Sequence, residues 1–345
     1  MTLTRWRAVA IKGRKLAARA IVAFVHASGL WLSLSSGACA SRAVRTTVPQ
    51  DLAWPPGSPR VALASVIETR RAGMALFSWI GGEKNVPLFE RPYGLAWQGG
   101  DLVVADPAAR RLVRVAASGK VTQSDPDPDF APLMVASCAD GLVASDSESG
   151  RVARFDTELR RVAWLAQGLD RPTGVACDAR AVWVVETGAH RLVILGRDGS
   201  RRIVGGRGTG DGQFNFPVAL VRLGGAVLVG DTLNFRIQQL DAATGRFLGA
   251  FGRLGDAAGD TPRLKGIATD AAGHVWASDA HLDQVSIYTA QGQLLMSLGR
   301  SGSAPGEFAF PAGVAAHPDG RVAVADALNR RVQVFRLLPA APVKP

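Results

Sequence analysis

One short pattern recurs six times in this 345-residue sequence and limits the folds open to it. Each copy has an apolar run, a turn and a second apolar run that ends in an acid. Five positions after the acid, a basic or polar residue opens a third run. The acids lie 40 to 48 residues apart and are Asp106, Asp146, Glu186, Asp231, Asp279 and Asp326. Repeats of this length indicate an array built from one supersecondary unit.

The apolar runs are short, β-branched and bounded by turn residues, and the chain carries 39 Gly and 19 Pro. A period of 40 to 48 residues is the length of a four-stranded propeller blade, whereas helical repeats need longer runs. We therefore predict an all-β fold, a six-bladed β-propeller of four-stranded antiparallel blades over residues 59–337. The run 60–67 is expected to pair with 331–337 and close the ring, which would remove an exposed edge. The competing segment 74–80 is interpreted as a linking helix or turn.

The residues of the later repeats resemble a known family. Segment 210–217 (GDGQFNFP) with 231–236 (DTLNFR), and segment 305–311 (PGEFAFP) with 326–335 (DALNRRVQVF), are similar to NHL repeats. The resemblance extends over residues 88–336. It departs at Met134, where other repeats have Gly or Ala, at Glu186 and at Gln284. The whole chain also resembles exported bacterial NHL-repeat proteins, which begin with a segment like Trp54-Pro55-Pro56.

Residues 1–40 are predicted to be an export signal: six basic residues and no acid, then a mostly apolar stretch and small residues. Either the chain is cut before Ser41, or Cys39 is lipidated as in a lipoprotein. Residues 41–58 are interpreted as a Pro-rich linker and 338–345 as a flexible tail. We expect an exported protein, periplasmic or a membrane-anchored lipoprotein, that meets the membrane only through a lipid at Cys39.

Net charge does not indicate nucleic acid as a partner. The formal charge is +11, but six of the basic residues lie in the predicted signal and the rest of the chain carries only +5. A dispersed excess of this size is typical of a solvated surface.

Cys138 and Cys177 fall near the ends of the innermost strands of adjacent blades. A disulfide between them is geometrically possible, but the spacing of those strands could exceed the limit of about 7 Å between Cα atoms. Two buried free thiols are the favoured interpretation.

The repeated acid and the basic residue five positions later are predicted to clamp the loop between them by charge-assisted hydrogen bonds. A position shared by every blade favours a structural role over ligand binding. The clamp residues are Asp106 with Arg111, Asp146 with Arg151, Glu186 with Arg191, Asp231 with Arg236, Asp279, and Asp326 with Arg331.

The position just before the first strand of each repeat is irregular around the ring. It holds in turn Arg91, Ala131, Arg171, Phe216, Arg263 and Phe310, with Tyr93 and Lys265 two positions further along their strands. We predict a basic, partly aromatic channel rim made of Arg91, Tyr93, Arg171, Phe216, Arg263, Lys265 and Phe310. Anionic ligands would suit it. The alternative is that these arginines pair with neighbouring acids or simply face solvent.

Metal chemistry is the weaker hypothesis. Some NHL-type propellers hold zinc with three channel-facing histidines, but the histidines after the signal fall in loops on opposite faces and no three converge. We predict no metal site, no cofactor and no catalytic residues. The expected function is a non-enzymatic monomer of the cell envelope that binds an acidic small ligand or protein partner. The alternative is a metal-dependent hydrolase or lyase in the channel, with Glu186 and His190 as its least implausible participants.

Overall fold

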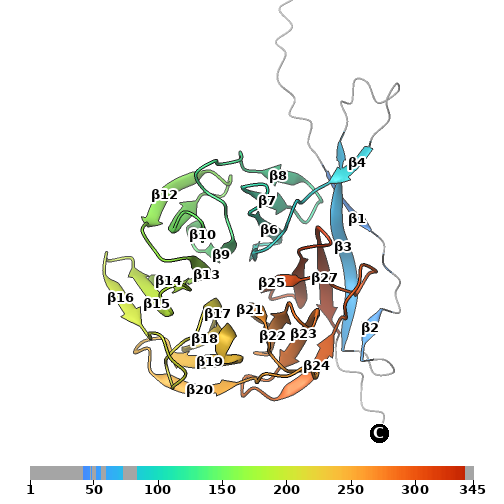
Figure 1. Ribbon diagram of the computed structural model, residues 1–345. Coiled ribbons are helices and arrows are strands. Elements are labelled where there is room, and N and C mark those ends of the chain that lie inside the picture. Colours follow the sequence, from blue (N-terminus) through green and yellow to red (C-terminus); the bar gives the residue numbers. More distant parts are fainter. Residues whose placement is uncertain (1–41, 47, 49–51, 56–59, 73–83, 339–345) are drawn as a thin grey trace, which may run out of the picture. The chain divides into compact units, whose positions relative to one another are not determined.

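The computed structural model describes residues 42–46, 48, 52–55, 60–72 and 84–338, which all lie in one compact unit, Cys39–Pro345. The export signal, Cys39, the 74–80 segment and all but the first residue of the predicted tail 338–345 lie outside the described residues, so those predictions are not tested by the structure. Six antiparallel sheets stand around a central axis (Figure 1). The fold is therefore the six-bladed β-propeller that the repeats predict. Among the described residues no helix is long and apolar enough to cross a membrane.

Each of the first five blades has four strands in chain order from the channel outward, here called a to d. Blade one has β5 (Leu95–Gln98), β6 (Asp101–Asp106), β7 (Arg111–Val115) and β8 (Val121–Gln123). Blade two has β9 (Met134–Cys138), β10 (Gly141–Asp146), β11 (Arg151–Phe155) and β12 (Arg161–Ala166). Blade three has β13 (Pro172–Cys177), β14 (Ala181–Glu186), β15 (Arg191–Gly196) and β16 (Arg201–Val204).

Blades four and five repeat this order. Blade four has β17 (Pro217–Leu223), β18 (Ala226–Asp231), the 3-10 turn η2 (Thr232–Asn234), β19 (Arg236–Asp241) and β20 (Phe247–Phe251). Blade five has β21 (Leu264–Thr269), β22 (Val275–Asp279), β23 (Gln284–Tyr288) and β24 (Leu294–Leu298).

Blade six closes the ring with a strand from before the repeats. Its strands a to c are β25 (Pro311–Ala316), β26 (Arg321–Asp326) and β27 (Arg331–Leu337), and its fourth is β3 (Val61–Ala72). The register pairs Val332 with Ile67 and Leu337 with Val61. The predicted closure is confirmed. It gives every blade a full sheet and leaves no unpaired edge on β27.

The segment predicted as a linker is partly strand. β1 (Arg42–Thr46) and β2 (Ala53–Trp54) both pair with β3, and β4 (Lys84–Pro87) pairs with its second half. β1 also reaches blade one, because the Ala43 N–H donates to the Gly119 carbonyl at 2.8 Å. The Pro-rich composition hid these strands, since backbone pairing on a long neighbouring strand does not require an apolar run.

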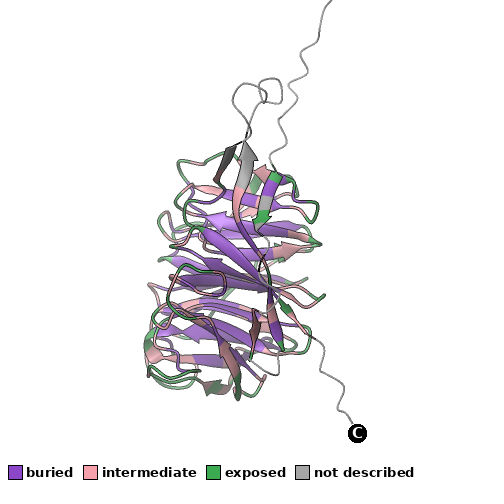
Figure 2. Cartoon of the chain, turned by 90° about the vertical axis from the view of Figure 1, so that its right-hand side faces the viewer, coloured by how far each residue is buried: buried purple, intermediate pink, exposed green. Residues whose placement is uncertain are grey.

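The core lies between blades, not within one of them. Six clusters of buried apolar side chains each join two neighbouring blades, for example Trp183 and Val185 of blade three with Val227 and Val229 of blade four. The second strand of each blade is buried along most of its length, while the outermost strands face solvent on one side (Figure 2). Burial on both faces explains why the second strands are nearly continuous apolar runs.

The innermost strands approach one another so closely that some positions accept only glycine. A Cβ atom added to Gly94 would lie 2.5 Å from the Cα atom of Met134, and one added to Gly313 would lie 2.3 Å from the Tyr93 carbonyl oxygen. These contacts fix the radius of the channel and so the spacing of the side chains at its rim.

Candidate functional site

The rim of the channel is built by the loop that leads into each innermost strand. In five of the six blades a proline follows the rim residue, and its fixed φ angle restricts the direction of the backbone as it enters the strand. Three rim residues, Arg171, Phe216 and Phe310, have positive φ angles of 53°, 50° and 60°. Such angles are unfavourable for bulky residues, so the surrounding contacts must impose them.

The repeated acid imposes much of this loop geometry. In every blade its carboxylate accepts a hydrogen bond from a backbone N–H of the loop at the rim, and the donors are Glu90 and Arg91, Ala131, Asp170, Asn215, Arg263 and Ala309. All six acids are buried. The feature common to the six blades is therefore this bond from acid to loop amide, which attaches the rim to the end of strand b.

The ion pair with the basic residue five positions later is less general. It is present in blades three, four and six: Glu186 with Arg191 at 2.6 Å, Asp231 with Arg236 at 3.0 Å, and Asp326 with Arg331 at 2.7 Å.

Blades one and two differ from the expected clamp. The Nε of Arg111 is buried without a hydrogen-bond partner, and the guanidinium of Arg151 lies over the Trp164 ring at 4.9 Å. Asp146 instead accepts from the Ser149 hydroxyl at 2.6 Å. The strand register places each of these arginines opposite its acid. Even so, neither guanidinium forms an ion pair with that acid.

A second set of contacts joins each blade to the next at the same face, and the sequence pattern did not reveal it. The residue four positions after each acid has a positive φ angle: Arg110, Gly150, His190, Phe235, Asp283 and Arg330. From this position a side chain or carbonyl reaches the rim loop of the following blade. His190 Nδ1 accepts from the Phe216 N–H, and Asp283 accepts from the Phe310 N–H. We call these contacts the blade latches.

The other latches use different groups at the same position. Arg110 donates to the Asp127 and Pro128 carbonyls, Arg330 donates to the Phe89 carbonyl, and the Gly150 and Phe235 carbonyls accept from Leu169 and Thr261. Because the chemistry varies while the position stays fixed, only the spacing of four residues after the acid could have signalled the latches.

The predicted rim cations gather at one mouth of the channel. Burial lowers the pKa of the Lys265 ammonium, and the charges of Arg263, Arg91 and Arg171 lower it further while Asp279 opposes them. Burial raises the pKa of Tyr93 to about 12, against the opposing effect of Arg91 and Arg263. Arginines of blades one, three and five therefore all lie near enough to Lys265 to lower its pKa.

None of these four cations forms an ion pair with an acid in the described part of the chain. Three of the four contact aromatic rings instead. Arg91 and Lys265 lie 5.8 Å and 5.4 Å from the Phe310 ring centre, and Arg171 lies 5.9 Å from that of Phe216. A cation within about 6 Å of a ring is attracted by its quadrupole but keeps its hydrogen-bond donors free. No close ion pair between a rim arginine and a neighbouring acid is therefore present among the described residues.

Glu186 and His190, named for an alternative enzyme, are both engaged in the fold. The Glu186 carboxylate binds Arg191 and the Asp170 N–H, while the buried His190 ring holds the Phe216 N–H. Among the described residues no three His, Cys, Asp or Glu side chains are grouped so that they could share a metal ion.

The opposite end of the channel differs from the rim. Side chains of all six innermost strands line a cavity of about 440 Å³ there, and its walls are mostly aliphatic or small. Leu95, Val135, Val175, Leu220 and Ile267 are among them and are only 6–7% exposed. The channel therefore has a cationic mouth and an apolar one.

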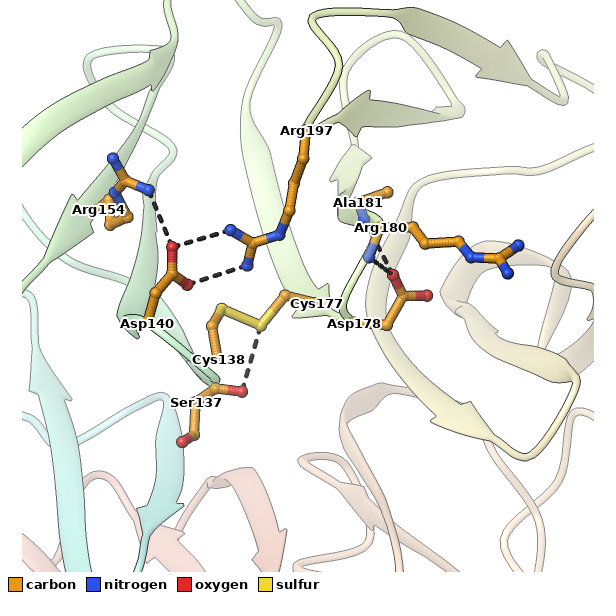
Figure 3. The surroundings of a disulfide bond; sticks show 9 residues. All are labelled: Ser137, Cys138, Asp140, Arg154, Cys177, Asp178, Arg180, Ala181 and Arg197. Carbon is orange, nitrogen blue, oxygen red and sulfur yellow. Dashed lines mark hydrogen bonds and ion pairs between the residues drawn. A yellow bond between two sulfur atoms is a disulfide. The ribbon is translucent and has the colours of Figure 1, made fainter.

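Cys138 and Cys177 form a disulfide beside the apolar mouth, so the expectation of free thiols is wrong (Figure 3). Their Cα atoms are 5.7 Å apart, because strands a of blades two and three converge at this end. Both residues are half-buried. Next to the disulfide, Asp140 of blade two receives two hydrogen bonds from Arg197 of blade three, at 2.8 Å and 2.9 Å. Two kinds of bond thus join this pair of blades.

Comparison with known proteins agrees with the fold. The family model of the NHL repeat matches residues 308–335. No curated protein sequence matches the chain.

Several solved structures are similar in shape. A streptogramin B lyase is 14% identical over 72% of this chain and 94% of its own, with a TM-score of 0.55. A gluconolactonase from Xanthomonas campestris is 17% identical over 86% of this chain and 100% of its own, with a TM-score of 0.58. An auxiliary nutrient binding protein from Bacteroides thetaiotaomicron is 11% identical over 72% of this chain and 69% of its own, with a TM-score of 0.58. At these identities the likeness extends to the fold alone.

Proposed function

We propose that this six-bladed β-propeller, which has an NHL repeat at residues 308–335, is a non-enzymatic binding module whose channel rim recognises an acidic ligand or protein partner. We further propose that it works outside the cytoplasm, as the sequence of residues 1–40 indicates. The rim consists of Arg91, Tyr93, Arg171, Phe216, Arg263, Lys265 and Phe310.

One observation carries the proposal: four cations face one another at this mouth without an acid partner among the described residues. Like charges held this close repel, and a bound anion would relieve the repulsion. Arginine presents donors in a planar fork that matches a carboxylate, so carboxylates in particular suit the three arginines. Phe216 and Phe310 would keep the guanidinium planes in place while the anion binds.

The fold supports a preformed site. Each rim loop is attached to its own blade through the acid and to the preceding blade through a latch, so the rim residues have little freedom to reorganise. A rigid site does not spend binding energy on ordering side chains.

The test is binding of a fluorescent hexaglutamate peptide, followed by anisotropy at low salt. We expect the double variant Arg91→Ala/Arg171→Ala to bind at least about tenfold more weakly, since each substitution removes a charge-assisted contact. The control is Arg180→Ala/Arg201→Ala, which makes the same change in net charge at exposed positions away from the rim.

Unchanged affinity in the rim variant, or an equal loss in the control, would contradict the proposal. Natural partners can then be sought by comparing what the wild-type protein and the rim variant each retain from envelope extract. Metal analysis of the purified protein tests the enzymatic alternative, because a stoichiometric zinc or calcium ion would speak against a simple binding module.

A further inference from the structure

A second cationic cavity lies where the ring closes, at the end of blade six opposite the rim. It has a volume of about 410 Å³ and is lined by Arg45, Arg321 and Arg336, together with apolar residues that include Ile67, Leu102 and Val334. The three arginines come from β1, β26 and β27. Its volume falls within the range of about 300–1,000 Å³ that is typical of small-molecule sites.

Two irregularities in β3 flank this cavity. Register shifts occur where β27 passes from Val334 to Phe335 and where β1 passes from Val44 to Arg45, so that β3 has an extra residue at Ala64 and another at Glu68. A β-bulge bends its strand and redirects the side chains beside it. Ala64, at the first irregularity, lines the cavity together with Ser65 and Ile67, which lie between the two.

The arrangement of charge is unfavourable without a ligand. Arg321 and Arg336 are directly opposite each other in neighbouring antiparallel strands, a position in which like charges destabilise a sheet. Partial burial lowers the pKa of Arg45, which remains exposed to solvent, and the charge of Arg321 lowers it further. Asp319 pairs with Arg321 at 2.8 Å, but neither Arg45 nor Arg336 has an acid partner in the part of the chain that the structure describes.

The repeat does not require this arrangement. The residues that correspond to Arg321 and Arg336 are Ala181 and Gly196 in blade three and Ala226 and Asp241 in blade four. The ring is also already closed by β3, so Arg45 on the added strand β1 is not needed for closure. The three cations are therefore a local feature of blade six.

Trp97 of blade one completes the cavity. The Arg321 guanidinium lies 4.4 Å from its ring centre, and the indole nitrogen donates to the Ala315 carbonyl, which fixes the ring. A flat aromatic wall beside an aliphatic floor and a cationic opening suits a molecule with an apolar body and one acidic group.

We propose that this cavity is a binding site for a small organic anion, a carboxylate, sulfonate or phosphate with an apolar body, held by Arg45 and Arg336 with its body against Trp97 and the floor. The site is separate from the rim and does not depend on the function proposed for it.

The test uses 1-anilinonaphthalene-8-sulfonate, an aromatic sulfonate that fluoresces when its rings leave water. Titration of the purified full chain should show saturable binding. Arg45→Gln/Arg336→Gln should weaken binding by about tenfold or more, because two charge-assisted contacts are lost. Ala64→Leu keeps every charge but occupies space, and it should weaken binding as well. Both arginines and Ala64 are exposed, so thermal melting should show that all variants remain folded.

The matched control is Arg180→Ala/Arg201→Ala, which makes the same change in net charge at exposed positions outside both sites and should bind the dye like the wild-type protein. The rim variant Arg91→Ala/Arg171→Ala is titrated in parallel to show whether the dye also occupies the rim. The proposal is overturned if the wild-type protein shows no saturable binding or if Arg45→Gln/Arg336→Gln keeps its affinity. It is also overturned if only the rim variant loses the dye, which would assign the dye to the rim.

Discussion

His190 Nδ1 accepts a hydrogen bond from the backbone N–H of Phe216 across the boundary between blades three and four, at 3.0 Å. The two rings also meet edge to face, with centroids 4.5 Å apart. Both residues have positive φ angles, 55° and 50°. One side chain of blade three therefore holds a rim residue of blade four in a backbone conformation that a phenylalanine would otherwise avoid.

His190→Ala should destabilise the propeller by about 1–2 kcal/mol, because it leaves the Phe216 N–H without its acceptor. His190→Asn should cost less, since asparagine tolerates positive φ and keeps a side-chain acceptor. Urea unfolding gives both free energies. Equal losses in the two variants would show that ring packing, and not the hydrogen bond, makes the latch.

Removing a clamp acid should cost more than removing a latch. Asp231 accepts from the Asn215 N–H and from the side chains of Asn234, Arg236 and Gln238. Asp231→Ala should lower the free energy of unfolding by about 3–5 kcal/mol, because it leaves a partly buried guanidinium without its carboxylate.

The control for Asp231 is an ion pair with an exposed cation. Arg253 pairs with Asp260, but its side chain is 76% exposed. Arg253→Ala should cost no more than about 1 kcal/mol. Chemical denaturation gives the free energy of unfolding of both variants. If Asp231→Ala lost no more than Arg253→Ala, the clamp would contribute little to the stability of the loop.

In blade five a clamp ion pair can be added instead of removed. Gln284 stands opposite Asp279, where other blades have arginine, and its buried Nε2 has no hydrogen-bond partner. Gln284→Arg should restore the ion pair and stabilise the fold by about 1 kcal/mol. The reverse change in blade four, Arg236→Gln, should destabilise it. A Gln284→Arg protein that melts at a lower temperature than the wild type would show that blade five has no room for the guanidinium.

The disulfide closes a loop with a sequence separation of 39 residues. Removing it with Cys138→Ala/Cys177→Ala should lower the free energy of unfolding by about 3–4 kcal/mol, chiefly through the greater freedom of the unfolded chain. Reduction of the wild-type protein should have the same effect and should add nothing in the double variant. An unchanged midpoint of unfolding after complete reduction would contradict this expectation.

Asp140 should make stability depend on acid pH. Hydrogen bonds from Arg197 hold the pKa of its carboxyl well below the ordinary value of about 3.9. The charge of Arg197 and a hydrogen bond from Arg154 act in the same direction, whereas burial opposes them. A lowered pKa in the folded state means that Asp140 contributes stability above that ordinary value and loses it as pH falls.

The variant for this prediction is Asp140→Asn. It should be destabilised by less than about 1 kcal/mol at pH 7, because the pair is partly exposed, and the difference from wild type should shrink towards pH 2–3. Urea unfolding at several pH values gives the comparison. A difference that stays constant with pH would exclude the carboxylate charge as its cause.

Much of the fold could be predicted because the same strand and turn pattern occurs in the sequence of all six blades. The acids that end the second strands, from Asp106 to Asp326, fall at the last residue of β6, β10, β14, β18, β22 and β26. The pairing of β3 with β27 followed from the missing fourth strand of blade six. The rim could also be placed, because the position before each first strand is fixed by the same register.

Other features depend on distances that no pattern encodes. The disulfide required strands a of blades two and three to converge, and sequence spacing gives no measure of that approach. Arg151 was expected to bind Asp146, but Trp164 offered a competing surface on the neighbouring strand. The cavity of Arg45, Arg321 and Arg336 brings together residues from three strands, one of them in a segment whose composition suggested a linker.

The pairing of β3 with β27 also determines at what stage of synthesis the propeller ring can close. The two strands are separated in the sequence by all five other blades, so the sixth sheet cannot assemble until those blades have left the ribosome. Until then β3 lacks its partner in the ring, and contacts of such long range make folding slow. We therefore expect the ring to stay open until the whole of blade six has been synthesised.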